Sequence, residues 1–214
     1  MTTKEKILYE ALEMFSYKGY DSVSIRDISK AVEIKESSIY YHFKSKQEIL
    51  ETIINETLKR YVNVLNNLKI PSVGIDNVSD FYDKQSEDEF LDICCNIFLF
   101  YLNDEYISKL RRLLTIEQYN NIKIGQIFVE FFIERVIERQ REVLQEFIDS
   151  ERFIDGDAYT MALQFYSPVF LLLYKYDKIE NGEEKALKEL KLHAKQFNAI
   201  YLNKNKAEHK IWKE

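Results

Sequence analysis

Glycine and proline are scarce in this chain, at five and two of 214 residues. Tight turns between β-strands depend on these residue types, because glycine adopts positive φ and proline fixes the backbone of a bend. A sheet protein of this length needs many such reversals, so the composition predicts an all-helical fold. Hydrophobic residues at 46% and charged residues at 31% are ordinary for a globular protein and too apolar for a disordered one.

The sequence lacks the patterns of membrane, secreted and metal-binding proteins. Residues 1–6 are charged where a signal peptide carries its apolar run. The most apolar stretches, 93–102 and 169–174, are shorter than the roughly 18 residues of a membrane helix. We therefore expect a cytoplasmic protein with no membrane partner. The only cysteines, Cys94 and Cys95, are adjacent, which excludes a disulfide framework and metal-ligand spacing, so no metal or cofactor is predicted.

Three short helices are predicted before residue 44 from the helical spacing of their apolar side chains. Gly19 can take the positive φ that follows a helix end, and Ser24 is a capping residue at the start of the second helix. Three short helices with a tight turn before the third are the plan of a helix-turn-helix DNA reader. The predicted division is a DNA-binding domain at 1–46 and a larger helical domain at 47–214.

Long helices are predicted from residue 45 onward. Ser45 and Glu48 form a capping box at the start of a helix that extends to Leu68, and a break at 70–74 follows. The further helices are predicted at 86–102, 104–118, 121–150, 157–177 and 183–202. Pro168 lies inside the fourth of these, where it should kink or split the helix because it has no N–H to donate.

The third short helix has side chains suited to DNA. Its first turn is polar, whereas Ile39 and Phe43 are spaced to pack against the three-helix core. Hydroxyl, carboxylate and guanidinium groups can hydrogen-bond to base edges, while basic and aromatic residues near the end of the unit can reach phosphates. The candidates for base contacts are Arg26, Lys35, Glu36, Ser37 and Ser38. The candidates for phosphate contacts are Tyr40, His42, Lys44 and Lys46, the last in the first turn of the next helix.

The segments 7–15, 18–20, 24–29 and 38–46 resemble the TetR family of bacterial transcriptional repressors. The most specific part is Tyr-Tyr-His-Phe-Lys-Ser-Lys at 40–46. The resemblance covers about residues 4–50 and implies that Tyr40 and Lys46 bind phosphates, while the five base candidates lie at or near bases.

The chain departs from the family pattern at two positions. Glu33 stands in a turn where the family usually has glycine, and a non-glycine residue at positive φ is strained. Lys35 stands where the family often has Ser or Thr, so the third helix lacks its usual side-chain cap. We expect an altered turn or cap within an unchanged fold.

Several of these side chains have a purely structural alternative. Tyr40 and Tyr41 could be core aromatics, since most aromatics on a buried helix face only pack. Lys44 and Lys46 could be ordinary solvated charges.

Aromatic residues are more abundant than a helical core requires, with 15 Tyr and 14 Phe. Most of those at helical spacing belong to the core, but tyrosine also offers an apolar body with a polar tip, which suits a pocket for a partly apolar small molecule. The resemblance implies such an effector pocket within the first four helices beyond residue 85. The candidate lining residues are Phe98, Tyr101, Tyr119, Phe128, Phe132, Phe165 and Tyr166.

The last two predicted helices look like the family's dimerisation pair. A two-fold dimer of these helices makes a four-helix bundle and sets two recognition helices against successive major grooves of a near-palindromic operator. The apolar stripes expected at the homodimer interface are Met161, Phe165, Val169 and Leu172 on one helix and Leu190, His193, Phe197 and Ile200 on the other.

Three functions remain open from the sequence. The first is a repressor that binds double-stranded operator DNA as a homodimer and is released by an unidentified small-molecule effector. The second is a DNA-binding regulator, activator or repressor, without an effector. The third is a helical interaction protein or an enzyme, although no catalytic motif is present. The net charge of −6 does not exclude DNA binding, because residues 1–50 contain eight Lys or Arg and eight Asp or Glu, so the acidic excess belongs to 51–214.

Overall fold

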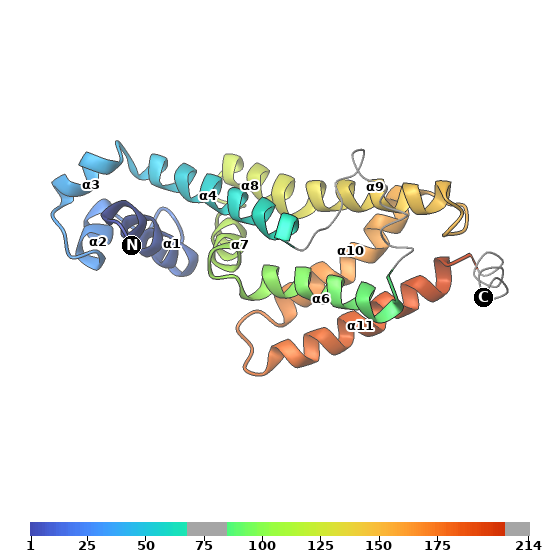
Figure 1. Ribbon diagram of the computed structural model, residues 1–214. Coiled ribbons are helices and arrows are strands. Elements are labelled where there is room, and N and C mark those ends of the chain that lie inside the picture. Colours follow the sequence, from blue (N-terminus) through green and yellow to red (C-terminus); the bar gives the residue numbers. More distant parts are fainter. Residues whose placement is uncertain (68–84, 204–214) are drawn as a thin grey trace. The chain divides into compact units, whose positions relative to one another are not determined.

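The computed structural model describes residues 1–67 and 85–203, and these residues are mainly helical (Figure 1). They contain no β-strand, only an isolated antiparallel bridge between Phe153 and Leu202. The predicted all-helical fold is therefore confirmed. No helix in the described ranges has the length and apolar character needed to cross a bilayer. The predicted break at 70–74 and the predicted helix end at Leu68 lie outside the described residues.

The first helix ends and the second helix begins where the predicted capping residues Gly19 and Ser24 lie. The bounds of the first three helices are Thr3–Lys18 for α1, Ile25–Ala31 for α2 and Glu36–His42 for α3. The Ser24 hydroxyl accepts a hydrogen bond from the Asp27 N–H, and the Asp27 carboxylate accepts one from the Ser24 N–H. Gly19 has a φ of 81°, and its N–H donates to the carbonyl of Phe15. The Ser24 cap and the Gly19 helix end are both confirmed.

The three short helices share an apolar core. Its most buried large side chains, each at most 2% exposed, are Ile7, Leu12, Phe15, Ile28, Ile39 and Phe43. Seven residues are too few for α3 to be stable by itself in water. The burial of Ile39 and Phe43 therefore holds α3 in place, as the sequence predicts, and leaves its opposite face free.

Helices α4 (Lys46–Asn67), α7 (Glu105–Glu117) and α8 (Ile122–Val129) belong to the same compact unit as α1–α3. The unit comprises residues 1–67 and 103–132, and within it α1 and α4 both pack against α7. It is larger than the predicted 1–46 domain because of these contacts, whereas the division by function at residue 46 stays a prediction.

The cap of α4 differs in one detail from the predicted capping box. The Ser45 hydroxyl accepts a hydrogen bond from the Glu48 N–H at 3.1 Å, as expected. The Glu48 carboxylate, however, accepts from the N–H of Lys44 at 2.6 Å, one residue before the predicted donor. Both bonds satisfy N–H groups at the start of the helix, so the predicted helix start is confirmed.

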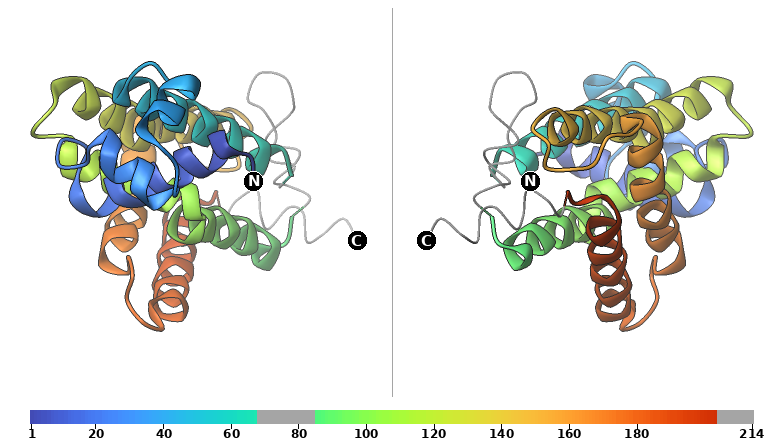
Figure 2. Two further views of the ribbon diagram at one scale, coloured as in Figure 1. Left: turned by 90° about the vertical axis from the view of Figure 1, so that its left-hand side faces the viewer. Right: turned by 90° about the vertical axis from the view of Figure 1, so that its right-hand side faces the viewer.

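The remaining described residues, 85–102 and 133–203, form a second compact unit. Its helices are α6 (Glu87–Asn103), α9 (Arg135–Asp149), α10 (Ala158–Lys175) and α11 (Gly182–Tyr201). Within it α10 packs against α9 and α11, and α10 and α11 lie side by side (Figure 2). The core consists of apolar and aromatic side chains, among them Phe147, Phe153, Met161, Tyr166 and Phe197.

Proline does not split α10. The helix continues from Ala158 to Lys175 through Pro168, so of the two predicted outcomes, a kink or a split, the split is excluded. Tyr166 and Leu172 are buried on either side of the proline, and their packing holds both halves in one helix.

The helix predicted at 121–150 contains a π-helical segment. The run consists of α8, a π-helix at Glu130–Glu134 and α9. A π-helix bonds residue i to i+5, so each such turn shifts the following side chains around the axis relative to an α-helix. Phe131 and Phe132 of this segment are buried. The spacing of apolar residues did not predict it, because a single π turn only slightly displaces a helical repeat.

Candidate nucleic-acid interface

The turn between α2 and α3 closes without glycine. Glu33 has a φ of 60°, in the left-handed region that is strained for a residue other than glycine. Its N–H donates to the carbonyl of Lys30 at 3.2 Å, and the N–H of Ile34 donates to the carbonyl of Ser29 at 2.9 Å. These backbone hydrogen bonds hold the turn in a conformation that is unfavourable for a glutamate.

The first turn of α3 has no side-chain cap. Lys35 is the N-cap residue, in an extended conformation, and makes no capping hydrogen bond with its side chain. The absence of the usual cap hydroxyl, predicted from the sequence, is confirmed. Lys35, Glu36 and Ser37 are exposed and Ser38 is half-buried, so the polar groups at the start of the helix face solvent.

The exposed face of α3 continues through its aromatic residues. Tyr40 is 54% exposed and Tyr41 is 86% exposed, which makes the core alternative wrong for both. His42 is half-buried, and its ring lies edge-on to the Tyr41 ring at a centroid distance of 5.2 Å. Arg26 of α2 and Lys44 after α3 are also exposed. Most of the predicted DNA-binding side chains are therefore accessible on or beside one short helix.

Lys46 differs from the other candidates because its charge is engaged within the fold. Its Nζ donates to the carbonyls of Tyr20 at 2.9 Å and Val23 at 3.0 Å, and it lies 4.2 Å from the centre of the Tyr20 ring. The alternative of an ordinary solvated charge is wrong for this residue. An ammonium has three N–H donors, so one remains for a phosphate. The sequence could not predict these bonds, because their acceptors are backbone carbonyls more than 20 positions away.

Charge on this surface is nearly balanced. The exposed cations between residues 26 and 44 are Arg26, Lys30, Lys35 and Lys44, and the exposed anions are Asp27, Glu33 and Glu36. Hydrogen bonds from the Ser24 hydroxyl and backbone lower the pKa of Asp27, which keeps the helix cap charged. A nearly neutral surface gains little from phosphate attraction alone, so hydrogen bonding and shape must carry more of any affinity for DNA.

The aromatic candidates for effector binding differ in exposure. Those that are buried are Phe98, Tyr101, Phe128, Phe132 and Tyr166, and Phe165 is half-buried. Tyr119 is 89% exposed, which contradicts a role in lining an enclosed pocket. It lies in the turn between α7 and α8, where the chain reverses and the side chain projects into solvent. The aromatic rings of Phe128 and Phe132 pack at a centroid distance of 5.9 Å.

Most of the predicted dimer stripe is buried inside the chain itself. Met161, Leu172, Leu190 and Phe197 are 1–6% exposed within the chain, so little of each side chain is left for a partner subunit to cover, and their role at an interface stays a prediction. The physical reason for this burial is that α10 packs on both α9 and α11, which uses this stripe for the internal core. The remaining candidates Phe165, Val169 and His193 are half-buried, and Ile200 is 54% exposed.

A different face of α10 and α11 exposes large apolar side chains. On α10 these are Tyr159, Leu163, Leu171 and Tyr174, and on α11 they are Leu192 and Ile200, with exposures between 37% and 70%. Their spacing of three, four and eight residues places the members of each set on one side of their helix. Exposed apolar side chains gathered on one side of a helix are typical of an interaction site. Sequence reasoning identified only Ile200 of this face and missed the other residues, although the spacing of Leu163, Leu171 and Tyr174 was a usable signal.

The cysteines and acidic residues offer no metal site within the described ranges, where no group of three His, Cys, Asp or Glu side chains is suitably placed. Cys94 and Cys95 are free thiols. Burial raises the pKa of Cys94 to about 12, so its thiol stays protonated at neutral pH.

Sequence comparison finds related proteins. The family described as bacterial regulatory proteins, tetR family, matches residues 7–53. The biofilm operon icaADBC HTH-type negative transcriptional regulator IcaR of Staphylococcus aureus strain Newman is 31% identical over 156 residues, which cover 68% of this chain and 77% of the relative. IcaR of Staphylococcus epidermidis is also 31% identical, over 105 residues that span 49% of this chain and half the length of that relative.

Structure comparison finds the same fold. A complex of SmeT with triclosan aligns with a TM-score of 0.69 at 18% identity, covering 94% of this chain and 92% of SmeT. SmeT is the repressor of the Stenotrophomonas maltophilia multidrug efflux pump SmeDEF.

Proposed function

Because the chain belongs to the TetR family of bacterial regulatory proteins, we propose that it is a repressor that binds a near-palindromic operator as a homodimer and releases it when a small-molecule effector binds. The observation that carries the proposal is α3, whose polar first turn is exposed while Ile39 and Phe43 are buried behind it. A short helix held from one side and polar on the other suits the major groove. The IcaR relatives are negative transcriptional regulators, which supports repression.

The side chains divide by the contacts that they can make. Arg26, Lys35, Glu36, Ser37 and Ser38 surround the start of α3 and are proposed to contact bases. Tyr40, His42 and Lys44 are proposed to contact phosphates from the end of the same helix. Lys46 has a single N–H donor left for a phosphate and is proposed to act mainly by fixing the loop that contains Tyr20 and Val23.

The exposed apolar face of α10 and α11 supports homodimerisation. Leu163 and Leu171 of one helix and Leu192 and Ile200 of the other are too exposed to stabilise the isolated chain fully. A two-fold axis beside these helices buries the same face of both subunits in a four-helix bundle. The half-buried Phe165, Val169 and His193 are proposed to border this interface.

The effector is proposed to be a partly apolar small molecule that contacts some of the aromatic candidates other than Tyr119. SmeT, which has the same fold, binds triclosan, and this supports an apolar aromatic ligand. Binding of the effector would move α4, which follows the DNA-reading helices, and change the separation of the two copies of α3. An effector can do so only if it binds the released state more tightly than the DNA-bound state.

The test begins with selection of duplexes by the full-length protein from a random library and from the DNA upstream of its own coding sequence. Salt-dependent binding to a two-fold symmetric site is expected, and its absence would reject DNA binding. Triclosan and a panel of aromatic compounds are then screened for an increase in melting temperature. Compounds that bind should weaken the protein–DNA complex in a mobility shift assay. If all bound compounds leave the complex intact, the chain is a regulator without this effector switch.

A further inference from the structure

Helix α7 holds most of the buried polar side chains of the described chain. Seven polar or charged residues are buried in the described ranges, and four of them lie in the 13 residues of α7. These four are Ser108, Lys109, Arg111 and Glu117. Burial of a polar group costs free energy unless it is hydrogen-bonded or paired, so such groups are expected where a directional contact is formed. Two of the four, Lys109 and Glu117, form their contacts with α1 and with the loop that follows it.

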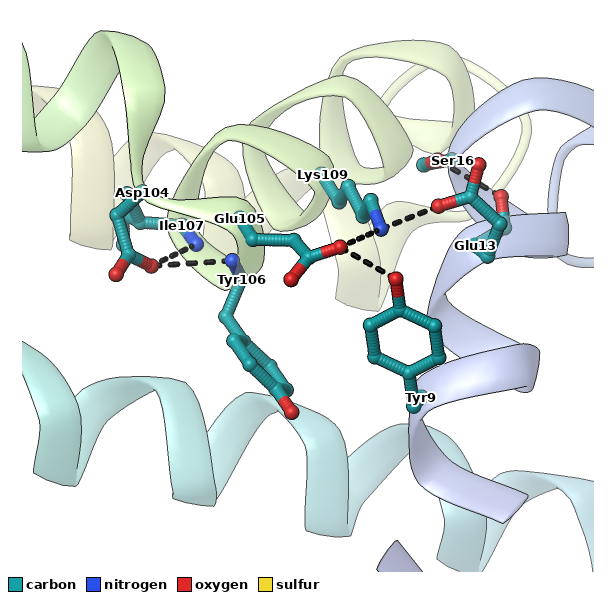
Figure 3. A network of polar contacts seen from close by, with 8 residues as sticks. All are labelled: Tyr9, Glu13, Ser16, Asp104, Glu105, Tyr106, Ile107 and Lys109. Atoms are coloured by element: carbon teal, nitrogen blue, oxygen red, sulfur yellow. Dashed lines mark hydrogen bonds and ion pairs between the residues drawn. The ribbon is translucent and has the colours of Figure 1, made fainter. Parts of the chain in front are cut away.

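The first attachment joins Lys109 of α7 to α1 (Figure 3). The Lys109 ammonium forms ion pairs with Glu13 of α1 and with Glu105 one turn earlier in α7, the latter at 2.9 Å. The Tyr9 hydroxyl of α1 donates to the same Glu105 carboxylate at 2.5 Å. Burial acts to lower the pKa of Lys109, but hydrogen bonds to Glu13 and Glu105 outweigh it and raise the pKa above its ordinary value. The ammonium is therefore charged at neutral pH.

The second attachment joins the last residue of α7 to the loop that follows α1. Oε1 of Glu117 accepts a hydrogen bond from the backbone N–H of Tyr20 at 2.7 Å, and Glu117 is only 3% exposed. A Cβ atom at Gly19 would lie 2.5 Å from this oxygen. The positive φ of Gly19 is strained for any other residue, and a side chain there would also force the Glu117 carboxylate to shift.

Tyr20 is held from two sides. Glu117 accepts from its N–H, while Lys46, the first residue of α4, donates to its carbonyl at 2.9 Å and also to that of Val23. The loop leads directly to Ser24, which caps α2. The loop before α2 and α3 is therefore attached to α7 and α4 by directional hydrogen bonds.

The two attachments are separated along α7. Lys109 and Glu117 are eight residues apart, which corresponds to about 12 Å along a helix axis. A single contact allows α1 to pivot about it, whereas two contacts at this separation resist rotation. Apolar packing alone permits sliding between helices more readily than hydrogen bonds with fixed partners do.

We propose that Lys109 and Glu117 are positioning residues for DNA binding, which fix the orientation of α1–α3 on α7 and thereby set the half-site spacing that the homodimer accepts. The inference rests on the proposed function. Half-sites read by a two-fold dimer lie about 34 Å apart, one turn of B-DNA, and a change of one base pair both shifts and rotates a half-site. A dimer with firmly oriented recognition helices discriminates between spacings, and one with loosened helices does not.

The experiment uses the full-length protein and the duplex selected by the wild type. The same half-sites are moved closer or farther by one and two base pairs, and a duplex with one half-site is included. The wild type should prefer the selected spacing by about tenfold or more, a difference of about 1.4 kcal/mol. Lys109→Met and Glu117→Leu should reduce this preference to about threefold or less while single-half-site affinity stays within about threefold of the wild type.

Matched variants separate positioning from general stability. Glu117→Gln keeps an oxygen that can accept from the Tyr20 N–H and should restore most of the spacing preference. Arg141→Met removes an exposed ion pair with Glu138 in α9, at 2.5 Å, and should leave the preference unchanged.

The inference is overturned if Lys109→Met and Glu117→Leu discriminate between spacings as the wild type does. It is also overturned if they lose affinity equally for the single half-site and the full site. If circular dichroism finds Glu117→Leu unfolded, Lys109→Met and Glu13→Gln decide the question by the same criteria. If the wild-type protein selects no duplex, both the proposed function and the inference are overturned. If the wild type prefers one half-site spacing and the variants prefer it equally strongly, the inference alone is overturned.

Discussion

The surface of α3 and the surface of the α10–α11 pair are both candidates for interfaces, but they arise from opposite chemistry. The start of α3 exposes Lys35, Glu36 and Ser37, the polar residues that the sequence predicts to be accessible. On α10 and α11, by contrast, the predicted apolar residues Met161 and Leu190 are buried in the chain's own core. A polar side chain is costly to bury without a partner, so its exposure follows from its type. An apolar side chain is stabilised equally well by its own core or by another subunit.

Helix α10 has apolar side chains on two of its sides. Met161 and Leu172 face the internal core, whereas Leu163 and Leu171 are exposed on the other side. A helix that is apolar on both sides is covered on both sides in its functional state. The outer side of α10 is therefore the better candidate for the homodimer interface, and variants of the two sides should separate folding from dimerisation.

The largest expected effect is on dimerisation. Leu163→Glu combined with Leu171→Glu places carboxylates in the proposed interface, where unpaired buried charges cost several kcal/mol, so the dimer dissociation constant should rise by about 1000-fold or more. Sedimentation velocity should then detect monomers, and affinity for the selected duplex should fall. Ile122→Glu introduces the same charge at an exposed apolar site in α8 and should leave the dimer intact. A double variant that stays dimeric would place the interface elsewhere.

The next largest effect is on folding stability, and it tests the side of α11 that faces the internal core. Leu190→Ala removes a side chain that is 1% exposed, so the free energy of unfolding should fall by about 2–5 kcal/mol. Urea denaturation at fixed protein concentration measures this loss. Ile179→Ala, at a 53% exposed position, should change it by less than about 0.5 kcal/mol. Equal effects of the two substitutions would contradict the assignment of Leu190 to the core.

The next prediction concerns DNA binding by the polar surface of α3, where the expected effect is smaller. Tyr40→Ala removes a half-exposed side chain proposed to contact a phosphate, and it should weaken binding about tenfold on all duplexes without changing their ranking. Fluorescence anisotropy across several selected duplexes measures both quantities. Tyr119→Ala removes a more exposed tyrosine outside α2 and α3 and should have no effect. A loss confined to particular base sequences would assign Tyr40 to base reading instead.

The two serines near this surface should differ in what they control. Ser24→Ala removes the hydroxyl that caps α2 and should lower the free energy of unfolding by about 1 kcal/mol. Ser37→Ala, at an exposed position without a capping bond, should leave stability unchanged and alter the preferred base sequence. Thermal unfolding and duplex selection measure the two outcomes. Loss of stability in Ser37→Ala would indicate a structural role for this serine.

The smallest effect concerns the pH dependence of the contact between α1 and α7. Hydrogen bonds from Tyr9 and Lys109 lower the pKa of Glu105 below its ordinary value of 4.5. The lowered pKa contributes stability that is fully present above pH 4.5 and is lost as the pH falls through the lowered value. Urea denaturation at pH 6 and near pH 3 should therefore give a smaller pH dependence for Glu105→Gln than for the wild type. An identical dependence would mean that the unfolded state retains the same interactions.

Much of the fold follows from local sequence chemistry. Ser24 and Gly19 mark helix ends because a hydroxyl can accept from a backbone N–H and glycine can adopt positive φ. Helical spacing likewise predicts α10 and α11 to within one or two residues at each end. The exposed polar start of α3 follows from residue type. Each of these features depends on groups within a few positions of one another.

Tertiary structure alone decided which long-range partners these elements have. Lys46 donates to the backbone carbonyls of residues 20 and 23, and Glu117 accepts from a backbone N–H that is 97 positions away. The spacing of residue types along the chain therefore could not predict these hydrogen bonds. The same holds for the two sides of α10, since periodicity identifies an apolar stripe without saying what covers it. The sequence by itself determined an all-helical chain with a DNA-reading unit at its start. Packing determined which charges serve that unit and which apolar face is left for a partner, because both depend on residues that are distant in the chain.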